Sequence, residues 1–545
     1  MVTKADFKKA ASLAVQSVIK HGDTDIFPFP FENHAFFDKQ EDAVKLIIEY
    51  NENFEKYINL YPPKNVSSLT PVTYSGFRWA TQLDPIWNAH FLASVAAIGK
   101  KLELARIPKE NETVFSYRFE PDFKSGDIFN RDSGWLQFMR RSLVCAEVHA
   151  FTVICDISEF YPRLGHHRLE NALRQVAGET QYPKQIMSFL SNFSSTNSFG
   201  LPIGGPAARL LSEITINQVD RLLQSKGIVF TRFADDYHLF AATREDAYRN
   251  LIFLSEKLYT NQGLTLQKAK TRIMTSAEFK ATCPVKDEQP AEADKDARTA
   301  VDHSRSQLLQ FSLRFDPYSP TAEADYNALK AEIRKFDIIG MLKEELAKSR
   351  VHTALARKII AAIKYLEGKS REDAILSVIE NFDVLYPILS SVLMMVEHLY
   401  DDLEENTQTA VLSKLQELIE NDSHVLRVDM HLSYAIRVLS HSNTPQIQYI
   451  LQGLFDSRPS ELIRRDIILV MARWGEWYWL SDLKNRYREL SSPERRAFIA
   501  SSFILKDEGT HWRDHMKHEF DPFEKYILEW VRGKVGEQPN WRVPL

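Results

Sequence analysis

The 545-residue chain contains very little cysteine, with thiols only at Cys145, Cys155 and Cys283. Three cysteines are too few for a disulfide framework, and their spacing matches no zinc-binding signature. The composition therefore predicts a reducing, cytoplasmic setting, and it excludes a fold held together mainly by disulfide bonds or structural zinc.

Long apolar runs and a dominant charge are also missing. No stretch of about eighteen apolar residues occurs, so no membrane span is expected, and the N-terminus lacks the apolar core of a secretory signal. The 68 Lys and Arg residues against 73 Asp and Glu residues give a formal net charge of −5. This excludes a generally basic nucleic-acid coat but not a local basic groove.

What is present is a globular composition, with 44% hydrophobic and 26% charged residues. Residues 3–22 and 40–60 carry apolar side chains at helical spacing, so residues 1–69 are expected to form a helical extension. Further along, "TVFSYRFE" (113–120) predicts a strand, and "GWLQFMRRSLVCAEVH" (134–149) predicts a helix.

The stretch "FTRFADDYHLF", Phe230 to Phe240, alternates apolar and polar residues on both sides of an aspartate pair. This alternation predicts a β-hairpin with Asp235 and Asp236 at its tip. Adjacent carboxylates raise each other's pKa and gain nothing for folding. A plain surface turn remains open for this stretch in isolation, because aspartate is common in turns.

A third carboxylate follows another predicted strand. "FTVIC" is rich in β-branched and aromatic residues and leads directly into Asp156. If this strand neighbours the hairpin, three carboxylates converge and can hold two Mg²⁺ ions roughly 3.5–4 Å apart. Such cations would remove the repulsion within the aspartate pair.

Two more segments fit a phosphate-binding site. In "FGLPIGGPAARLL", Gly204 lies in a turn that permits close approach of a ligand to the backbone and that leads into a helix N-terminus. In "LTLQKAKTRIM", Lys270 could neutralise phosphate charge or protonate departing pyrophosphate. Taken singly, the first could be an ordinary helix-entry loop and the second a solvated lysine.

Together and in this order, these segments resemble the palm of a reverse transcriptase. "CDISEFY" resembles the first catalytic motif, "GLPIGGPAARL" the template-contacting motif, "FADD" the Tyr-Ala-Asp-Asp box and "GLTLQKAKT" the segment beyond it. The resemblance implies fingers and palm over residues 70–282. It also implies an RNA-directed DNA polymerase, a nucleotidyltransferase that adds dNTPs with Mg²⁺ or Mn²⁺.

The resemblance also implies roles for particular residues. The implied metal ligands are the three catalytic aspartates and one backbone carbonyl, namely Asp156, Asp235, Asp236 and Ile157. The implied nucleotide-binding residues are Arg118, Tyr161, Gly204 and Lys270. Among these, Arg118 in "TVFSYRF" would contact the triphosphate, and Tyr161 would pack under the sugar and exclude a 2′-hydroxyl.

Two departures from the family pattern stand out. Phe233 replaces the tyrosine of the box, which leaves metal binding intact. Ile203 stands where many members carry a glutamine that contacts template or nucleotide, which puts ordinary templated copying in doubt.

After the palm, residues 283–300 are polar and predict a linker, and residues 301–545 predict an all-helical domain. "ELIRRDIILVMARWG" and "PERRAFIASSFILKDEG" share an Arg-Arg pair, 495 − 464 = 31 residues apart, which suits a two-helix repeat. The expected fold is therefore α+β fingers and palm followed by a helical-repeat domain in place of the thumb. The arginines could line a product channel or pair between helices, and "WGEWYW" (474–479) could stack on bases or pack between helices.

Stretches at 21–38, 83–93 and 493–513 resemble bacterial abortive-infection and defence-associated reverse transcriptases. That branch implies antiphage defence, homo-oligomers and, in several members, untemplated synthesis of DNA that stays attached to a priming residue of the protein. Other members use a non-coding RNA, and no priming residue is assigned here. The alternatives are a conventional RNA-templated enzyme of retron or group II intron type and a catalytically dead binding scaffold. The complete carboxylate set argues against the scaffold.

Overall fold

The computed structural model describes residues 3–22, 26–194, 197–283, 305, 307–308, 322–538 and 540–545. Apart from Cys283, the predicted linker over 283–300 lies outside the described residues. Within them, every helix is too short or too polar to cross a membrane.

A four-stranded antiparallel sheet forms the centre of the region that carries the aspartates. Its strands lie in the order β6 (Val229–Phe233), β7 (Asp236–Ala241), β5 (Phe151–Asp156) and β8 (Arg272–Thr275). The predicted strand before Asp156 and the predicted hairpin are therefore both confirmed, and they are neighbours in the sheet.

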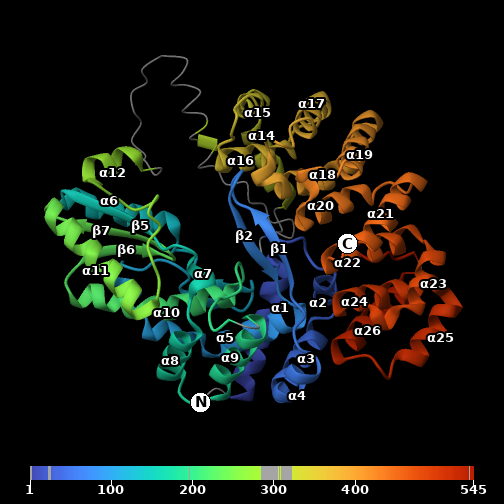
Figure 1. Ribbon diagram of the computed structural model, residues 1–545, viewed down its shortest axis with the longest axis horizontal. Coiled ribbons are helices and arrows are strands. Elements are labelled where there is room, and N and C mark those ends of the chain that lie inside the picture. Colours follow the sequence, from blue (N-terminus) through green and yellow to red (C-terminus); the bar gives the residue numbers. More distant parts are fainter. Residues whose placement is uncertain are drawn as a thin grey trace.

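Helices cover both faces of this sheet (Figure 1). On one face lie α6 (Trp135–Val148) and α12 (Ser276–Thr282), and on the other lie α10 (Pro206–Ser225) and α11 (Arg244–Gln262). Because side chains alternate between the two faces of a strand, each face buries its own apolar cluster. The helix predicted over 134–149 is confirmed as α6.

The strand predicted over 113–120 is wrong for most of its length. Val114 makes only an isolated bridge with Arg232, and Tyr117 has a left-handed backbone with φ of 46°. Regular pairing begins only at β3 (Phe119–Asp122). The physical reason is that the carbonyl of Tyr117 accepts a hydrogen bond from the Arg106 side chain, not from a neighbouring strand.

The N-terminal region is helical, as predicted. Its helices α1 and α3 pack against the long buried helix α5, and the second predicted helix is divided at Asn53. The bounds are α1 (Lys4–His21), α2 (Glu32–Asp38), α3 (Gln40–Glu52), α4 (Phe54–Leu60) and α5 (Pro85–Ala105). After β5, the chain forms helices α7 (Phe160–Arg163), α8 (His166–Ala177) and α9 (Gln181–Ser194).

A two-stranded ribbon, β1 (Val66–Pro71) and β2 (Phe77–Gln82), links this region to the C-terminal helices. At its tip, the Tyr74 hydroxyl donates to the Val384 carbonyl (2.5 Å) and accepts from the Val351 amide (2.9 Å). The ribbon is therefore anchored at its far end by the C-terminal region.

Every regular element that the structure describes beyond residue 321 is a helix, and these helices form two layers (Figure 1). In the inner row, α16, α18, α20, α22, α24 and α26 each pack against the next member, while α15, α17, α19 and α21 form the outer row. The bounds are α14 (Ala322–Ile333), α15 (Ile338–Leu346), α16 (Thr353–Ile363), α17 (Gly368–Ile379), α18 (Leu389–Leu399), α19 (Glu405–Glu420), α20 (Asp429–Leu439), α21 (Pro445–Ser457), α22 (Glu461–Trp474), α23 (Trp477–Asn485), α24 (Ser492–Ser501), α25 (Lys506–Met516) and α26 (Pro522–Glu537).

The C-terminal helices close onto the N-terminal helices, far from the central sheet in Figure 1. Buried Arg496 donates to Glu32 (2.7 Å) and Asp84 (3.1 Å). The Trp530 indole donates to Asp38 (2.7 Å). Arg496 therefore joins two parts of the chain and does not face a product channel.

The other arginines of the two Arg-Arg pairs are also engaged. Arg465 is buried and donates to Asp466 and Gln82, while Arg464 pairs with Glu494 and Arg495 with Glu524. Of the two interpretations of these arginines, the structure supports pairing between elements.

Candidate active site

The aspartate pair lies at a two-residue hairpin turn. Phe233 pairs with Asp236, which leaves Ala234 and Asp235 as the turn. Ala234 has a φ of 54°, a left-handed conformation that costs a non-glycine residue about 1–2 kcal/mol. Strain of this kind persists only where surrounding contacts hold the backbone in place.

The third carboxylate lies directly across the sheet. Asp156 ends β5 and is the register partner of Asp236 on β7. The next amide, that of Ile157, donates to the carbonyl of Asp235 over 3.0 Å, which fixes the turn against the end of β5. The strand register therefore sets Asp156 beside the turn that carries Asp235 and Asp236.

Burial and mutual repulsion disfavour ionisation of the aspartate pair. Burial and then the charge of Asp156 raise the pKa of Asp235. Burial, followed by the charges of Asp235 and Asp156, raises the pKa of Asp236 to about 7. The site thus holds more negative charge than this half-buried environment accommodates without a cation.

The sequence-predicted Lys270 supplies one cation. Its ammonium donates to Oδ2 of Asp156 over 2.6 Å, from a turn whose Gln267 amide donates to the Asp156 carbonyl over 2.7 Å. Burial opposes the charge of Lys270, but the bond to Asp156 and the nearby aspartate charges raise its pKa. Its side chain is 63% exposed, so it is free to move aside.

The chemistry of this cluster fits a divalent metal, because carboxylate oxygens are the ligands that Mg²⁺ prefers. As the side chains lie, no three His, Cys, Asp or Glu side chains of the described residues converge tightly enough to hold an ion. The ammonium of Lys270 stands at Asp156 instead. Asp156, Asp235 and Asp236 are the residues that would hold such an ion.

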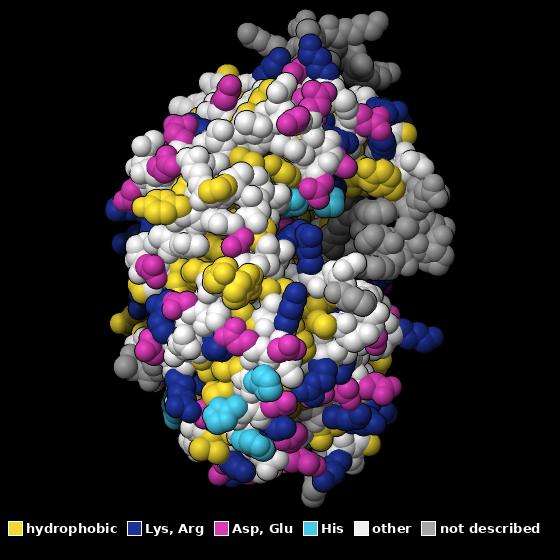
Figure 2. Space-filling model, turned by 90° about the vertical axis from the view of Figure 1, so that its right-hand side faces the viewer, with side chains coloured by type: hydrophobic (Ala, Val, Ile, Leu, Met, Phe, Trp, Pro, Cys, Tyr) yellow, Lys and Arg dark blue, Asp and Glu magenta, His cyan; other side chains and the backbone are white. Residues whose placement is uncertain are grey.

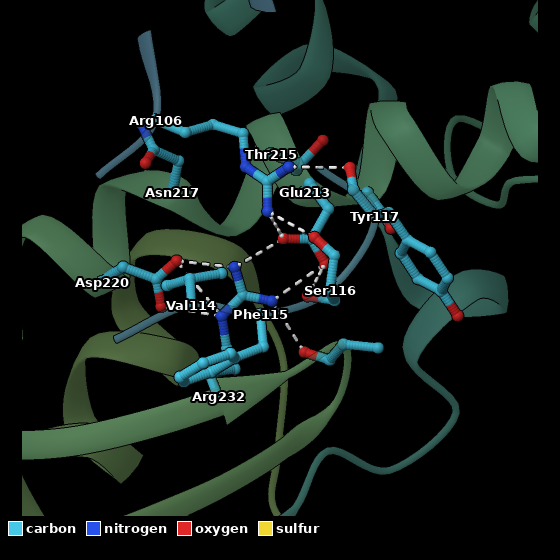
Figure 3. Close-up of polar contacts among 12 residues, drawn as sticks. Arg106, Val114, Phe115, Ser116, Tyr117, Glu213, Thr215, Asn217, Asp220 and Arg232 are labelled. Carbon is cyan, nitrogen blue, oxygen red and sulfur yellow. Dashed lines mark hydrogen bonds and ion pairs between the residues drawn. The ribbon is translucent and has the colours of Figure 1, made fainter. Parts of the chain in front are cut away.

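A buried cluster of charged side chains lies against the hairpin and is bonded to its turn (Figure 3). The Arg232 guanidinium donates to both oxygens of Glu213 (2.8 and 3.0 Å), to Asp220 (2.7 Å) and to the carbonyl of strained Ala234 (2.9 Å). Burial opposes the charge of Glu213, but Arg232 and Arg106 lower its pKa. Arg232 thereby fixes the turn that presents Asp235.

Sequence reasoning missed this cluster, although a signal exists. Glu213 and Asp220 are seven residues apart and therefore share the buried face of α10. Two acids among apolar residues on one helix face require buried cations, and those cations are Arg106 and Arg232.

The phosphate-binding role predicted for Arg118 is not supported. Its side chain is only 2% exposed, and its guanidinium donates to the Val114 carbonyl (2.7 Å) and to Glu103 (2.9 Å). Because these bonds occupy the guanidinium inside the fold, Arg118 positions the 114–118 segment. The irregular backbone around Tyr117, which the sequence did not predict, turns Arg118 inward.

Tyr161 lies in α7 and Gly204 in the turn before α10, and a backbone hydrogen bond joins the two segments. The Tyr161 carbonyl accepts from the Leu201 amide (2.9 Å), and its buried hydroxyl has no hydrogen-bond partner among the described residues. Gly204 has a φ of 109°, which L side chains rarely adopt, so this turn requires glycine. Their contacts with a nucleotide remain predictions.

The "WGEWYW" stretch has two side chains that pack within the fold and two that are exposed. Trp474 donates to the Ser440 carbonyl, and Trp479 packs edge-on against Phe455, so both serve the fold. Trp477 is 47% and Tyr478 75% exposed, and their rings stack on each other. The face formed by these C-terminal helices mixes both signs of charge without a continuous basic track over its described residues (Figure 2).

Comparison with known proteins agrees with this geometry. Residues 116–302 match the family described as reverse transcriptase (RNA-dependent DNA polymerase). Retron Ec86 reverse transcriptase of Escherichia coli is 25% identical over 127 residues, which cover 23% of this chain and 38% of that protein. The chain thus spans less than half of this curated relative.

Solved structures with some similarity include two telomerases. The telomerase of Candida albicans, in complex with a TWJ fragment of telomeric RNA, has a TM-score of 0.29 and 12% identity over 66% of this chain and 68% of its own. Apo telomerase of Candida Tropicalis has a TM-score of 0.28 and 11% identity over 76% and 73%. Similarity this low does not bear on function. The family match shows that residues 116–302 contain a reverse transcriptase domain, and the described residues beyond 321 form an all-helical region after it.

Proposed function

We propose that this chain is a Mg²⁺-dependent DNA polymerase that adds dNTPs to a growing DNA strand in antiphage defence. The observation that carries the proposal is the register of β5 and β7, which sets Asp156 opposite Asp236 with Asp235 at the adjoining turn. Mn²⁺ could replace Mg²⁺ at such an oxygen-rich site.

In the proposed reaction, a terminal hydroxyl attacks the α-phosphate of a dNTP in line, and pyrophosphate leaves. Bound Mg²⁺ would activate the hydroxyl and neutralise phosphate charge. Asp156, Asp235 and Asp236 would supply the ligands, with the carbonyl of Ile157. Lys270, released from Asp156, is within reach of the same phosphates and can protonate the leaving pyrophosphate.

The mode of synthesis forms the finer part of the proposal. We propose untemplated synthesis primed by a hydroxyl of the protein, because Ile203 replaces the glutamine that many templated members carry. The DNA product would then stay covalently attached. The helical region after residue 300 would take the place of the thumb, and the enzyme would work as a cytoplasmic homo-oligomer.

A second candidate is RNA-templated synthesis with an associated non-coding RNA. The partial identity to a retron reverse transcriptase favours this reading. The two candidates share the aspartates and the nucleotide, and they differ in what directs and primes the strand.

The test incubates purified protein with labelled dNTPs and Mg²⁺ but without template or primer. Each sample is split between protease and nuclease before denaturing electrophoresis. We expect label that migrates with the protein until protease treatment and that is absent from an Asp235→Ala/Asp236→Ala variant. Incorporation only after an RNA and a primer are added would select the second candidate. Equal incorporation by the double variant would refute the metal-site assignment.

A further inference from the structure

Arg209 is an arginine of the reverse transcriptase domain without an assigned role. It lies in the first turn of α10, directly after the Gly204 turn. Its guanidinium carbon lies 5.3 Å from the centre of the Tyr117 ring. That ring packs against Phe233 at 5.8 Å, and Phe233 is the residue before the Ala234 turn. One aromatic ring therefore separates Arg209 from the hairpin that carries the aspartates.

Among the described residues, the guanidinium of Arg209 has no anionic partner. It forms no ion pair and no side-chain hydrogen bond with them, although the side chain is half-buried. The nearby arginines differ, because Arg106 and Arg232 share Glu213 and Arg118 is bonded to Glu103. A partly desolvated cation without an anion is unfavourable, so this position is suited to an anion brought by a ligand.

The charges of Arg209 and Asp235 both act on the Tyr117 hydroxyl. Burial raises the pKa of Tyr117, the charge of Arg209 opposes that rise, and the charge of Asp235 adds to it. The Tyr117 hydroxyl therefore lies within range of both charges. The N-terminus of the 20-residue helix α10 contributes further positive potential at this end.

We propose that Arg209 binds a phosphate of the nucleoside triphosphate whose α-phosphate lies at Asp156, Asp235 and Asp236. It takes the role that the sequence suggested for Arg118, whose guanidinium is committed to the fold. The planar guanidinium can make two parallel hydrogen bonds to phosphate oxygens, and Tyr117 holds it from one side. This inference rests on the proposed polymerase function and adds a residue to it.

The test compares wild type, Arg209→Ala, Arg209→Lys and Arg221→Ala. Arg221 is a matched control on the same helix, exposed and bonded to the carbonyl of Ala105. Equilibrium dialysis measures binding of labelled dTTP with Mg²⁺, and thymidine serves as a probe without phosphate. We expect Arg209→Ala to weaken dTTP binding roughly ten- to hundredfold, with thymidine unchanged. Arg209→Lys should recover part of the loss, and Arg221→Ala should match wild type.

A parallel titration with single-stranded DNA distinguishes the source of the phosphate. If Arg209→Ala weakens DNA binding but not dTTP binding, Arg209 contacts the strand and the inference is overturned. Equal dTTP affinity of wild type and Arg209→Ala, with matching circular dichroism and unfolding curves, also overturns it while leaving the polymerase proposal intact. If wild-type protein binds no dTTP with Mg²⁺, the proposed function fails, and this inference fails with it.

Discussion

The ammonium of Lys270 lies 2.6 Å from Oδ2 of Asp156, at the cluster that we propose as the metal site. A tethered cation at this position competes with a divalent ion for the same carboxylate. We expect Lys270→Ala to increase Mg²⁺ affinity severalfold, as measured by isothermal titration calorimetry, and to slow nucleotide incorporation. Lys268→Ala serves as the control from the same segment. Unchanged or weaker Mg²⁺ binding in Lys270→Ala would show that the ammonium does not compete.

Mg²⁺ binding should depend on pH through Asp236. Burial and the neighbouring aspartates raise its pKa to about 7, so the folded protein holds a proton there at acidic pH. Because a metal ligand must be deprotonated, Mg²⁺ affinity is expected to rise with pH and to level off above about 7. Calorimetric titrations from pH 5.5 to pH 8.5 measure this, and a flat profile would contradict the assignment.

The same ionisation of Asp236 should lower the stability of the metal-free protein as pH rises, whereas it raises Mg²⁺ affinity. The carboxyl of Asp236 ionises near pH 3.8 when unfolded and near 7 when folded, so the folded state binds the extra proton between these values. Stability is therefore expected to decline as pH rises through this window. Denaturant unfolding with a chelator should show this decline in wild type and a smaller one in Asp236→Asn.

Loss of Arg232 should destabilise the domain, because the buried acids that it neutralises stay behind. Arg232→Ala leaves buried Asp220 without its ion-pair partner and leaves buried Glu213 with Arg106 alone. Breaking a buried ion pair typically costs about 3–5 kcal/mol of unfolding free energy. Denaturant unfolding tests this, with exposed Arg221→Ala as the control. A loss below about 1 kcal/mol would mean that the cluster relaxes or takes in water.

The ion pairs that join Arg496 to the N-terminal region give a further prediction. Arg496→Ala leaves Glu32 and Asp84 buried without their shared cation, so we expect a loss of about 3–5 kcal/mol. The C-terminal helices should also become easier to cleave in limited proteolysis. Arg488→Ala removes only the exposed pair with Glu519, which is worth less than about 1 kcal/mol. Similar losses in the two variants would refute the anchoring role of Arg496.

The sequence predicted the local elements of the site well, because each has its own local pattern. The strand before Asp156 was identified by its β-branched and aromatic residues and the hairpin around Asp235 by its alternation, and the register then placed them together. What the sequence could not show was the direction of single side chains. Arg118 points inward because the backbone at Tyr117 is left-handed, and no periodicity encodes that turn.

The sequence also could not show which residues pair over long distances along the chain. The two Arg-Arg pairs were recognised 31 residues apart, but one arginine of each pair has a partner on a distant element that a single sequence does not connect. Arg496 reaches Glu32, and Arg465 reaches Gln82. Buried charges indicate that partners exist, but only the fold identifies them.

The bond between Arg496 and Glu32 spans 464 residues, and this separation has a consequence for synthesis. A ribosome adding about 5–20 residues per second makes Arg496 roughly 20–90 s after Glu32. During that interval the central sheet, complete at Thr275, can already assemble, while the N-terminal helices still lack their final covering. The nascent chain therefore spends nearly the last half of its synthesis with a finished central sheet in an unfinished molecule.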